Sequence, residues 1–173
     1  MSSPSIAALF GQRVVIGVGD LSVSNNPAIT LSTYALGSCI AVVAYDATVR
    51  AGGLLHAMLP TSSLSPEKAG AQPAMFVDTG LNVLLRTLTG MKVDRRRMHI
   101  FLAGGASVLS GSDMFKIGER NIRATLAYLG GLGIRVSHSE VGGTINRTVH
   151  LNIGTGEISL KTPTATEKWS LAA

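Results

Sequence analysis

Cys39 is the only cysteine of the chain, and the residues around it would allow it to act as a nucleophile. It follows Gly37 and Ser38, which interrupt the chain between two β-rich runs, where a scaffold can expose a side chain. His56 lies 17 residues downstream, at the end of the next β-like run. Because a free thiol has a pKa of about 8.5, it needs a nearby base to react at neutral pH. This spacing fits a cysteine–histidine pair on two adjacent strands. The alternative is a small core thiol beside an unrelated histidine.

Two segments carry these residues, and together they resemble the signature of the CheD family of bacterial chemoreceptor glutamine deamidases. The first is Thr33–Cys39 (TYALGSC) and the second is Gly52–Pro60 (GGLLHAMLP). Further matching segments follow in the order and at about the spacing that the family shows. They are Phe76–Thr79, Ala103–Ser107, Ile117–Asn121, and Gly142–Gly143 with Arg147. The resemblance runs from about Arg13 to about Leu160, which is nearly the whole chain.

The resemblance implies a division of roles in amide hydrolysis. Expelling ammonia from a glutamine side chain requires a nucleophile, an acid–base group, a group that orients it, and donors for the oxyanion. Cys39 would attack the carboxamide carbon and form a thioester, and His56 would act first as acid and then as base. Thr33 matches the family's third catalytic residue and would hold the imidazole tautomer. Taken alone, a strand threonine is more readily explained by packing.

Other matched residues are expected to bind the oxyanion or position the substrate. The backbone N–H of Cys39 is the first candidate donor, and Gly37 and Ser38 would leave that backbone open to the substrate. The remaining matches have ambiguous roles, and helix capping, tight turns and structural salt bridges are favoured for them over substrate contact. They are Asp78, Gly104, Gly105, Ser107, Asn121 and Arg147. Asn146 stands where the family pattern leads us to expect a glycine, so the local turn there is in question.

The other histidines do not suggest a metal site. His99, His138 and His150 lack a helical i,i+4 partner and clustered cysteines. We therefore expect no metal and no cofactor. His138 and His150 could face each other across neighbouring strands, and half-exposed surface positions are the simpler expectation.

Composition indicates one well-packed domain. Of 173 residues, 46% are apolar and 14% are charged, which excludes a disordered chain. A single cysteine cannot form an internal disulfide, so nothing points to an oxidising compartment. No apolar stretch approaches the roughly 20 residues that span a bilayer, and residues 5–9 lack the basic flank of a signal peptide. We expect a cytoplasmic protein without membrane insertion.

The net charge of +5 suits an acidic partner, and its densest source is Arg95–Arg97. Nucleic-acid binding is disfavoured because aromatic residues are scarce and none lies among these arginines. The cluster is either a solvated loop or a surface that steers an acidic protein toward this one.

Periodicity predicts a single α+β domain, a layered sandwich of mixed β-sheets with helices packed outside. Residues 1–12 are expected to be a flexible leader, 13–161 the CheD-like deamidase domain and 162–173 a C-terminal tail. Strands are predicted at 13–18, 28–34, 40–45, up to 56, 99–103, 135–141, 148–153 and 157–161. Helices are predicted from about 73 to 90 and from about 119 to 129, with loops at 20–27 and 61–72. The apolar face of the first helix would comprise Met75, Leu81, Leu84, Leu85 and Leu88, and that of the second Ile122, Leu126 and Leu129. The resemblance implies in addition a relationship to toxin deamidases that use a cysteine and a histidine.

The function that the resemblance implies is hydrolysis of selected glutamines in methyl-accepting chemotaxis receptors to glutamates. Each event adds a negative charge and a methylation site, which biases receptor signalling. The resemblance also implies binding to a CheC-type phosphatase and allows a methylesterase side activity on the same sites. The alternative is a non-catalytic adaptor of the same fold that binds receptors or the phosphatase. It is disfavoured because Thr33, Cys39 and His56 are all present.

Overall fold

The computed structural model describes residues 11–108 and 114–173, which form two five-stranded sheets and a layer of helices. The strand order of the first sheet is β1 (Gln12–Val15), β3 (Ile29–Leu36), β8 (Arg147–Asn152), β9 (Glu157–Lys161) and β10 (Thr166–Ser170). The second runs β2 (Asp20–Ser24), β5 (Ala51–Ala57), β4 (Ile40–Asp46), β6 (His99–Gly104) and β7 (His138–Val141). The helices are α1 (Pro66–Ala71), α2 (Val77–Gly90) and α3 (Ile117–Gly131), with short 3₁₀ turns η2 (Ser62–Leu64) and η3 (Pro73–Met75).

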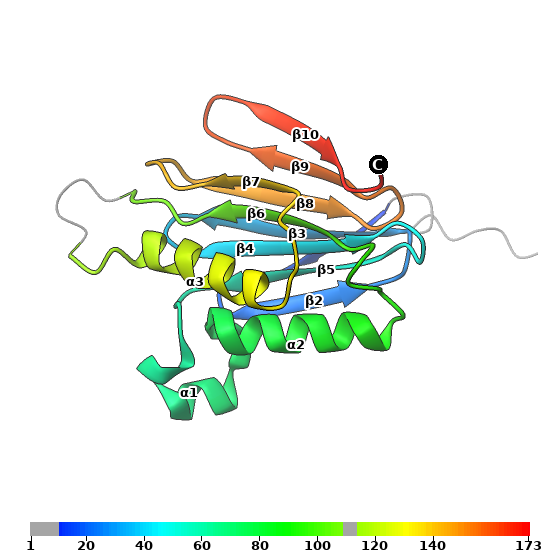
Figure 1. Ribbon diagram of the computed structural model, residues 1–173. Helices are drawn as coiled ribbons and strands as arrows, with labels where there is room; N and C mark the ends of the chain where they lie inside the picture. Colours follow the sequence, from blue (N-terminus) through cyan, green and yellow to red (C-terminus); the bar gives the residue numbers. More distant parts are fainter. Residues whose placement is uncertain (1–10, 109–113) are drawn as a thin grey trace, which may run out of the picture.

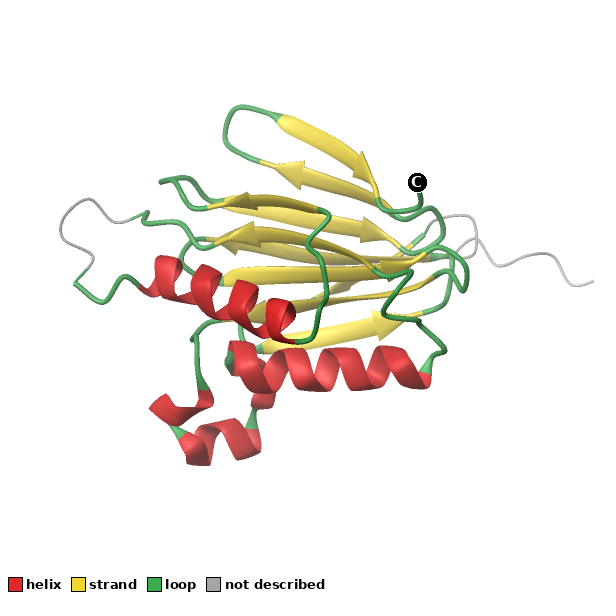
Figure 2. Ribbon diagram, viewed as in Figure 1, coloured by secondary structure: helices red, strands yellow, loops and turns green. Residues whose placement is uncertain are grey.

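The helices cover only one face of the second sheet, so the order of layers is sheet, sheet, helices (Figures 1 and 2). The alternating side chains of β4 show why. Ile40 and Val42 pack toward the helices together with Leu81 and Leu84 of α2. The intervening residues, such as Val43, pack between the two sheets. All of β4 is therefore buried, and both of its faces are apolar.

Both sheets are mixed. β1 pairs with β3 in parallel, and β6 pairs with β7 in parallel, whereas the remaining pairs are antiparallel. The predicted α+β sandwich of mixed sheets with outside helices is confirmed. The predicted apolar face of the first helix is confirmed for Leu81, Leu84, Leu85 and Leu88, which are buried in one cluster on α2. The predicted start near residue 73 was wrong, because the extended Phe76 separates η3 from α2 and Met75 packs in a different cluster.

A β-bulge near the end of β3 determines which of its residues point inward. The pairing with β8 passes from Thr33↔Val149 to Leu36↔Arg147, so β3 carries one extra residue. Ala35 absorbs it in the left-handed region, with φ of 54°. Strict alternation would turn Leu36 away from the side that Thr33 faces. With the bulge, both side chains are fully buried.

Several local predictions were wrong. The expected loop at 20–27 contains β2, whose polar residues pair with β5. The expected tail at 162–173 contains β10, which pairs with β9. Residues 61–72 were expected to be a loop and include η2 and α1. Leu126 was expected inside but is 48% exposed. His138 and His150 cannot face each other across neighbouring strands, because β7 and β8 belong to different sheets.

No helix in the described ranges is long and apolar enough to cross a membrane.

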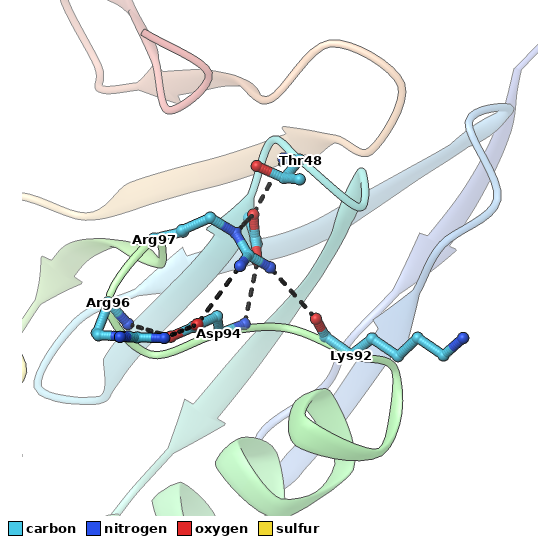
Figure 3. A network of polar contacts seen from close by, with 6 residues as sticks. Thr48, Lys92, Asp94, Arg96 and Arg97 are labelled. Atoms are coloured by element: carbon cyan, nitrogen blue, oxygen red, sulfur yellow. Dashed lines mark hydrogen bonds and ion pairs between the residues drawn. The ribbon is translucent and has the colours of Figure 1, made fainter.

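Two of the three clustered arginines make specific ion pairs rather than forming a free basic surface (Figure 3). Arg97 donates to both oxygens of Asp46, at 3.2 and 2.8 Å, and the Asp46 side chain is fully buried at the end of β4. Arg96 pairs with Asp94 at 2.9 Å. Burial alone would raise the pKa of Asp46, but hydrogen bonds from Arg97 and from the backbone N–H groups of Asp94 and Thr48 bring it below its ordinary value. Arg97 is therefore a structural residue.

We predict that Asp46→Asn lowers the free energy of unfolding by about 2 kcal/mol at pH 7, between the values for exposed and fully buried pairs because only Arg97 is partly exposed. Because the pKa of Asp46 is depressed in the fold, its stabilisation is present above its ordinary value of 3.8 and is lost as pH falls through the lower folded value. Urea unfolding of both proteins from pH 7 to pH 3 should show the difference shrinking in acid.

Arg96→Gln is the matched control, because the ion pair of Arg96 is 89% exposed on the arginine side and should contribute much less. Equal losses for the two variants, or an Asp46 effect that persists unchanged at pH 3, would contradict the assignment.

Candidate active site

Thr33, Cys39 and His56 come together at one end of the space between the two sheets. This is the end at which β6 and β7 finish, on the left of Figure 1. His56 of β5 lies directly opposite Ala41 of β4, and Cys39 lies two residues before Ala41. Cys39 packs against the cluster between the sheets, so it points to the same face as His56. Diagonal neighbours of this kind in antiparallel strands lie about 7 Å apart, which is within reach of an imidazole.

Thr33 reaches His56 from the opposite sheet. Its Oγ1 lies 2.7 Å from His56 Nδ1 and 2.7 Å from the carbonyl oxygen of Ile16. A carbonyl can only accept, so the single hydroxyl proton goes to Ile16, and Oγ1 must accept from an Nδ1–H. The contacts therefore specify a neutral imidazole protonated on Nδ1 with a lone pair on Nε2.

The Nε2 atom is buried and has no hydrogen-bond partner within residues 11–108 and 114–173. His56 is 2% exposed, and burial lowers its pKa below the ordinary value. Burial likewise raises the pKa of Cys39, an effect that its own backbone N–H partly offsets. Both shifts favour a neutral thiol beside a neutral imidazole in the resting protein. Thiolate formation then requires proton transfer to an unoccupied Nε2.

Three hydrogen bonds hold the loop that carries Cys39 in place. The N–H of Gly105 donates to the Cys39 carbonyl at 2.8 Å, and that of Ala106 donates to the Gly37 carbonyl at 2.8 Å. The amide of Asn121 donates to the Ser38 carbonyl at 2.9 Å. Every carbonyl in the Gly37–Cys39 turn is thus engaged. In contrast, the N–H groups of Ser38 and Cys39 have no backbone acceptor among the described residues.

Gly104 and Gly105 make the close fit of the Cys39 loop possible. Both have positive φ, 104° and 63°. A Cβ on Gly104 would lie 2.2 Å from the Cys39 carbonyl oxygen, so no other residue fits there. Their place in the structure is therefore beneath the Cys39 turn. Gly104 shapes its backbone through close van der Waals contact, and Gly105 does so through the hydrogen bond from its N–H to the Cys39 carbonyl.

Three other predicted residues lie further from the thiol. Asp78, at the start of α2, accepts from the Ser62 N–H and hydroxyl at 2.9 and 2.7 Å, which ties down η2. Ser107 donates its N–H to the Gly143 carbonyl at 2.9 Å. Arg147 is mostly buried and donates to the Gly142 carbonyl at 2.8 Å. None of these contacts reaches Thr33, Cys39 or His56.

Asn146 does not need the glycine that the family pattern led us to expect. It is not among the described non-glycine residues with positive φ. Its Oδ1 lies 3.4 Å from the position that a Cβ on Gly37 would occupy, so it borders the Cys39 turn.

A cavity of about 520 Å³ is lined in part by Gly105, Ser107 and Gly143. Neither Cys39 nor His56 lines it, so it lies beside the thiol rather than around it.

Two features of the site were missed from the sequence. The Ile16 carbonyl sets the tautomer of His56, but any residue supplies a carbonyl, so no residue type marks it. The left-handed Ala35 gave no signal because alanine rarely takes that conformation.

Within the described parts of the chain, no cluster of three or more histidine, cysteine or acidic residues could hold a metal.

Comparisons with known proteins point in one direction. The family model described as CheD chemotactic sensory transduction matches residues 58–162, beginning just after His56. A relative from Syntrophus aciditrophicus, named probable chemoreceptor glutamine deamidase CheD 1, is 42% identical and covers 86% of this chain and 92% of its own. Relatives from Solibacter usitatus and Pyrococcus abyssi, named probable chemoreceptor glutamine deamidases CheD, are 41% and 37% identical and cover 87% of this chain, and 89% and 91% of their own.

One crystallised protein, from Neisseria meningitidis, matches 72% of this chain and 52% of its own at 20% identity and a TM-score of 0.37, which is too distant to support an argument. The family model spans more than half of the chain, and the sequence relatives match along most of it. This chain belongs to the CheD family.

Proposed function

We propose that this protein deamidates glutamine side chains of methyl-accepting chemotaxis receptors, with Cys39 as nucleophile, His56 as acid–base group and Thr33 as the residue that orients His56. The relatives' names supply the substrate class. The observation that carries the proposal is the Thr33–His56 hydrogen bond at 2.7 Å. It leaves a bare Nε2 on the face of the sheet that Cys39 shares.

The reaction proceeds in two halves. Sγ of Cys39 attacks the carboxamide carbon as its proton passes to Nε2 of His56, giving a tetrahedral intermediate with its negative charge on oxygen. The imidazolium returns that proton to the nitrogen, ammonia leaves, and a thioester remains. Neutral His56 then takes a proton from water as the water oxygen attacks the thioester carbon. The carbon–sulfur bond breaks, the imidazolium returns its proton to the leaving sulfur, and glutamate, free thiol and neutral His56 result. Thr33 holds Nδ1 throughout, so Nε2 is the only nitrogen that exchanges protons.

The oxyanion faces the backbone of the Cys39 turn. The N–H groups of Ser38 and Cys39 have no backbone acceptor among the residues that the structure describes. The Cys39 N–H faces its own sulfur, which is where the oxyanion forms next to the attacked carbon. Donors held by a rigid turn need little rearrangement when charge develops on the oxygen. Gly37, Ser38, Gly104 and Gly105 shape this turn. Asp78, Ser107 and Arg147 would act at longer range, on receptor segments that flank the glutamine.

The same proposal covers domain organisation, location and partners. Residues 13–161 constitute the deamidase domain, and β10 adds a strand from the segment that follows. The expected leader at 1–12 lies outside the described residues except for its last two, of which Gln12 belongs to β1. The protein acts in the cytoplasm on receptors and also binds a CheC-type phosphatase. A non-catalytic adaptor is the competing role. It would have no use for the buried, unpartnered Nε2 of His56, which is costly to maintain.

We predict that Cys39→Ala abolishes deamidation and leaves the fold intact. A purified receptor fragment should gain about 1 Da per converted glutamine and release ammonia with the wild-type protein, and show neither change with the variant. Mass spectrometry of tryptic peptides and an ammonia assay measure the two products. Conversion by the folded variant would refute the cysteine mechanism, and an inactive wild-type protein would favour the adaptor.

We predict that Thr33→Val lowers kcat about 100-fold, because the imidazole loses the contact that fixes its tautomer. Thr33→Ser should keep most of the activity. Ser32→Ala is the matched control, since Ser32 makes the same type of contact, 2.7 Å to His150 Nδ1, from the same strand. Steady-state kinetics of the three variants distinguish orientation of His56 from packing. Similar losses for Thr33→Val and Ser32→Ala would contradict the assignment.

We predict that the acid limb of kcat/KM lies below pH 6.5, the ordinary pKa of histidine. Burial lowers the pKa of His56, so its neutral, basic form persists to lower pH. Activity at pH 6.5 should therefore exceed half of its plateau. An NMR titration of the His56 ring should give a midpoint that agrees with the kinetic limb. A limb at or above pH 6.5 would show that another group controls it.

A further inference from the structure

Asn121 is fully buried in α3, and its side chain joins the two segments that flank the candidate catalytic pair. Its Nδ2 donates to the Ser38 carbonyl at 2.9 Å and to the Met58 carbonyl at 3.0 Å. Ser38 immediately precedes Cys39, and Met58 follows His56 by two residues. Both amide hydrogens are used on oxygens that can only accept, so the orientation of the amide is fixed. One side chain thus sets the distance between the cysteine turn and the end of the histidine strand.

The contact to Ser38 also determines where the Cys39 N–H points. The Ser38 carbonyl and the Cys39 N–H belong to one peptide group, which is trans. In a trans peptide the C=O and the N–H point in opposite directions. Because Asn121 binds the carbonyl from the side of α3, the Cys39 N–H points away from the helix layer. A hydrogen bond to the carbonyl also polarises the peptide and makes its N–H a better donor.

Glycines bring α3 close enough for this contact. A Cβ on Gly118 would lie 2.5 Å from the Gly105 carbonyl oxygen, and a Cβ on Gly105 would lie 2.5 Å from Ile122. Any larger residue at either position would push the helix outward. The sequence segments Ala103–Ser107 and Ile117–Asn121 therefore pack against each other through their glycines. This close packing places Asn121 within hydrogen-bond reach of the cysteine turn.

The amide oxygen of Asn121 shows that packing alone does not explain why an asparagine occupies this position. Asn121 Oδ1 is buried and without a hydrogen-bond partner in the part of the chain that the structure describes. An orphaned acceptor is unfavourable, so the position retains an asparagine at a cost in stability. The double donation from Nδ2 is the compensating feature.

We infer that Asn121 is a positioning residue that aims the Cys39 N–H at the oxyanion and holds the cysteine turn in register with the strand of His56. The inference rests on the proposed deamidase function. An oxyanion donor acts in the transition state more than in the bound substrate, so its misplacement lowers kcat and leaves KM nearly unchanged.

The experiment compares Asn121→Ala and Asn121→Asp with wild type. A carboxylate keeps the size of the amide but cannot donate to either carbonyl. Both variants should lose about 10- to 100-fold in kcat with KM within about twofold. The matched control is Thr125→Val, because Thr125 is fully buried one turn later and donates to the Asn121 carbonyl at 2.8 Å without touching the cysteine turn. It should melt at a lower temperature and retain kcat below that temperature.

A second readout needs no receptor and therefore separates this inference from the proposed function. His56→Ala should change the rate at which iodoacetamide alkylates Cys39, and in an Asn121→Ala background that change should shrink about threefold or more. Asn121→Gln, which displaces the amide by one methylene, replaces Asn121→Ala if the latter does not fold. Undiminished His56 dependence together with wild-type kcat in a folded Asn121 variant would overturn the inference. Altered coupling in a protein that deamidates nothing would support the role of Asn121 in holding the cysteine turn in register with His56, and would refute the deamidase together with the oxyanion role.

Discussion

The hydroxyl of Thr33, on the first sheet, fixes the protonation of His56 on the second sheet. It has one proton, and the Ile16 carbonyl takes it, so the oxygen is left to accept from His56. The tautomer of a base on one sheet is therefore fixed by a backbone carbonyl and a strand residue of the other side of the sandwich. An aspartate in this place would stabilise an imidazolium through its charge. A threonine orients the ring without adding charge, which suits a buried pair that rests in its neutral form.

The site departs from ordinary local structure at several points, and each departure serves the same geometry. Ala35 takes a left-handed conformation, and the resulting bulge allows both Thr33 and Leu36 to face inward. His56 Nε2 and Asn121 Oδ1 are buried without partners in the described structure. Such strain and unpaired polarity are unfavourable for folding and concentrate where function requires them. The apolar cluster between β4 and α2, where no such exceptions occur among the residues discussed, supplies the compensating stability.

Features that depend on neighbouring residues could be predicted from the sequence. Features that depend on contacts between residues far apart in the chain could not. The apolar period of α2 and the strand that ends at His56 were read correctly because each depends on neighbouring residues. The sequence of β2 is typical of a loop because its polar residues, Asp20, Ser22 and Ser24, gain their strand conformation from pairing with β5. Arg97 was grouped with Arg95 and Arg96 because its partner, Asp46, lies 51 residues away. Thr33 was identified by family resemblance alone, since its contact with His56 joins two sheets.

A layered sandwich suits this chemistry because each layer contributes one constraint that the others cannot. The second sheet places Cys39 and His56 on one face at diagonal positions of adjacent strands, which brings them near each other but leaves both free to turn. The first sheet orients the imidazole through Thr33. The helix layer, through Asn121, binds the Ser38 carbonyl from the other side of the second sheet. The base is thus fixed from one side and the nucleophile's backbone from the other. A single sheet covered on one face could supply only one of these two constraints.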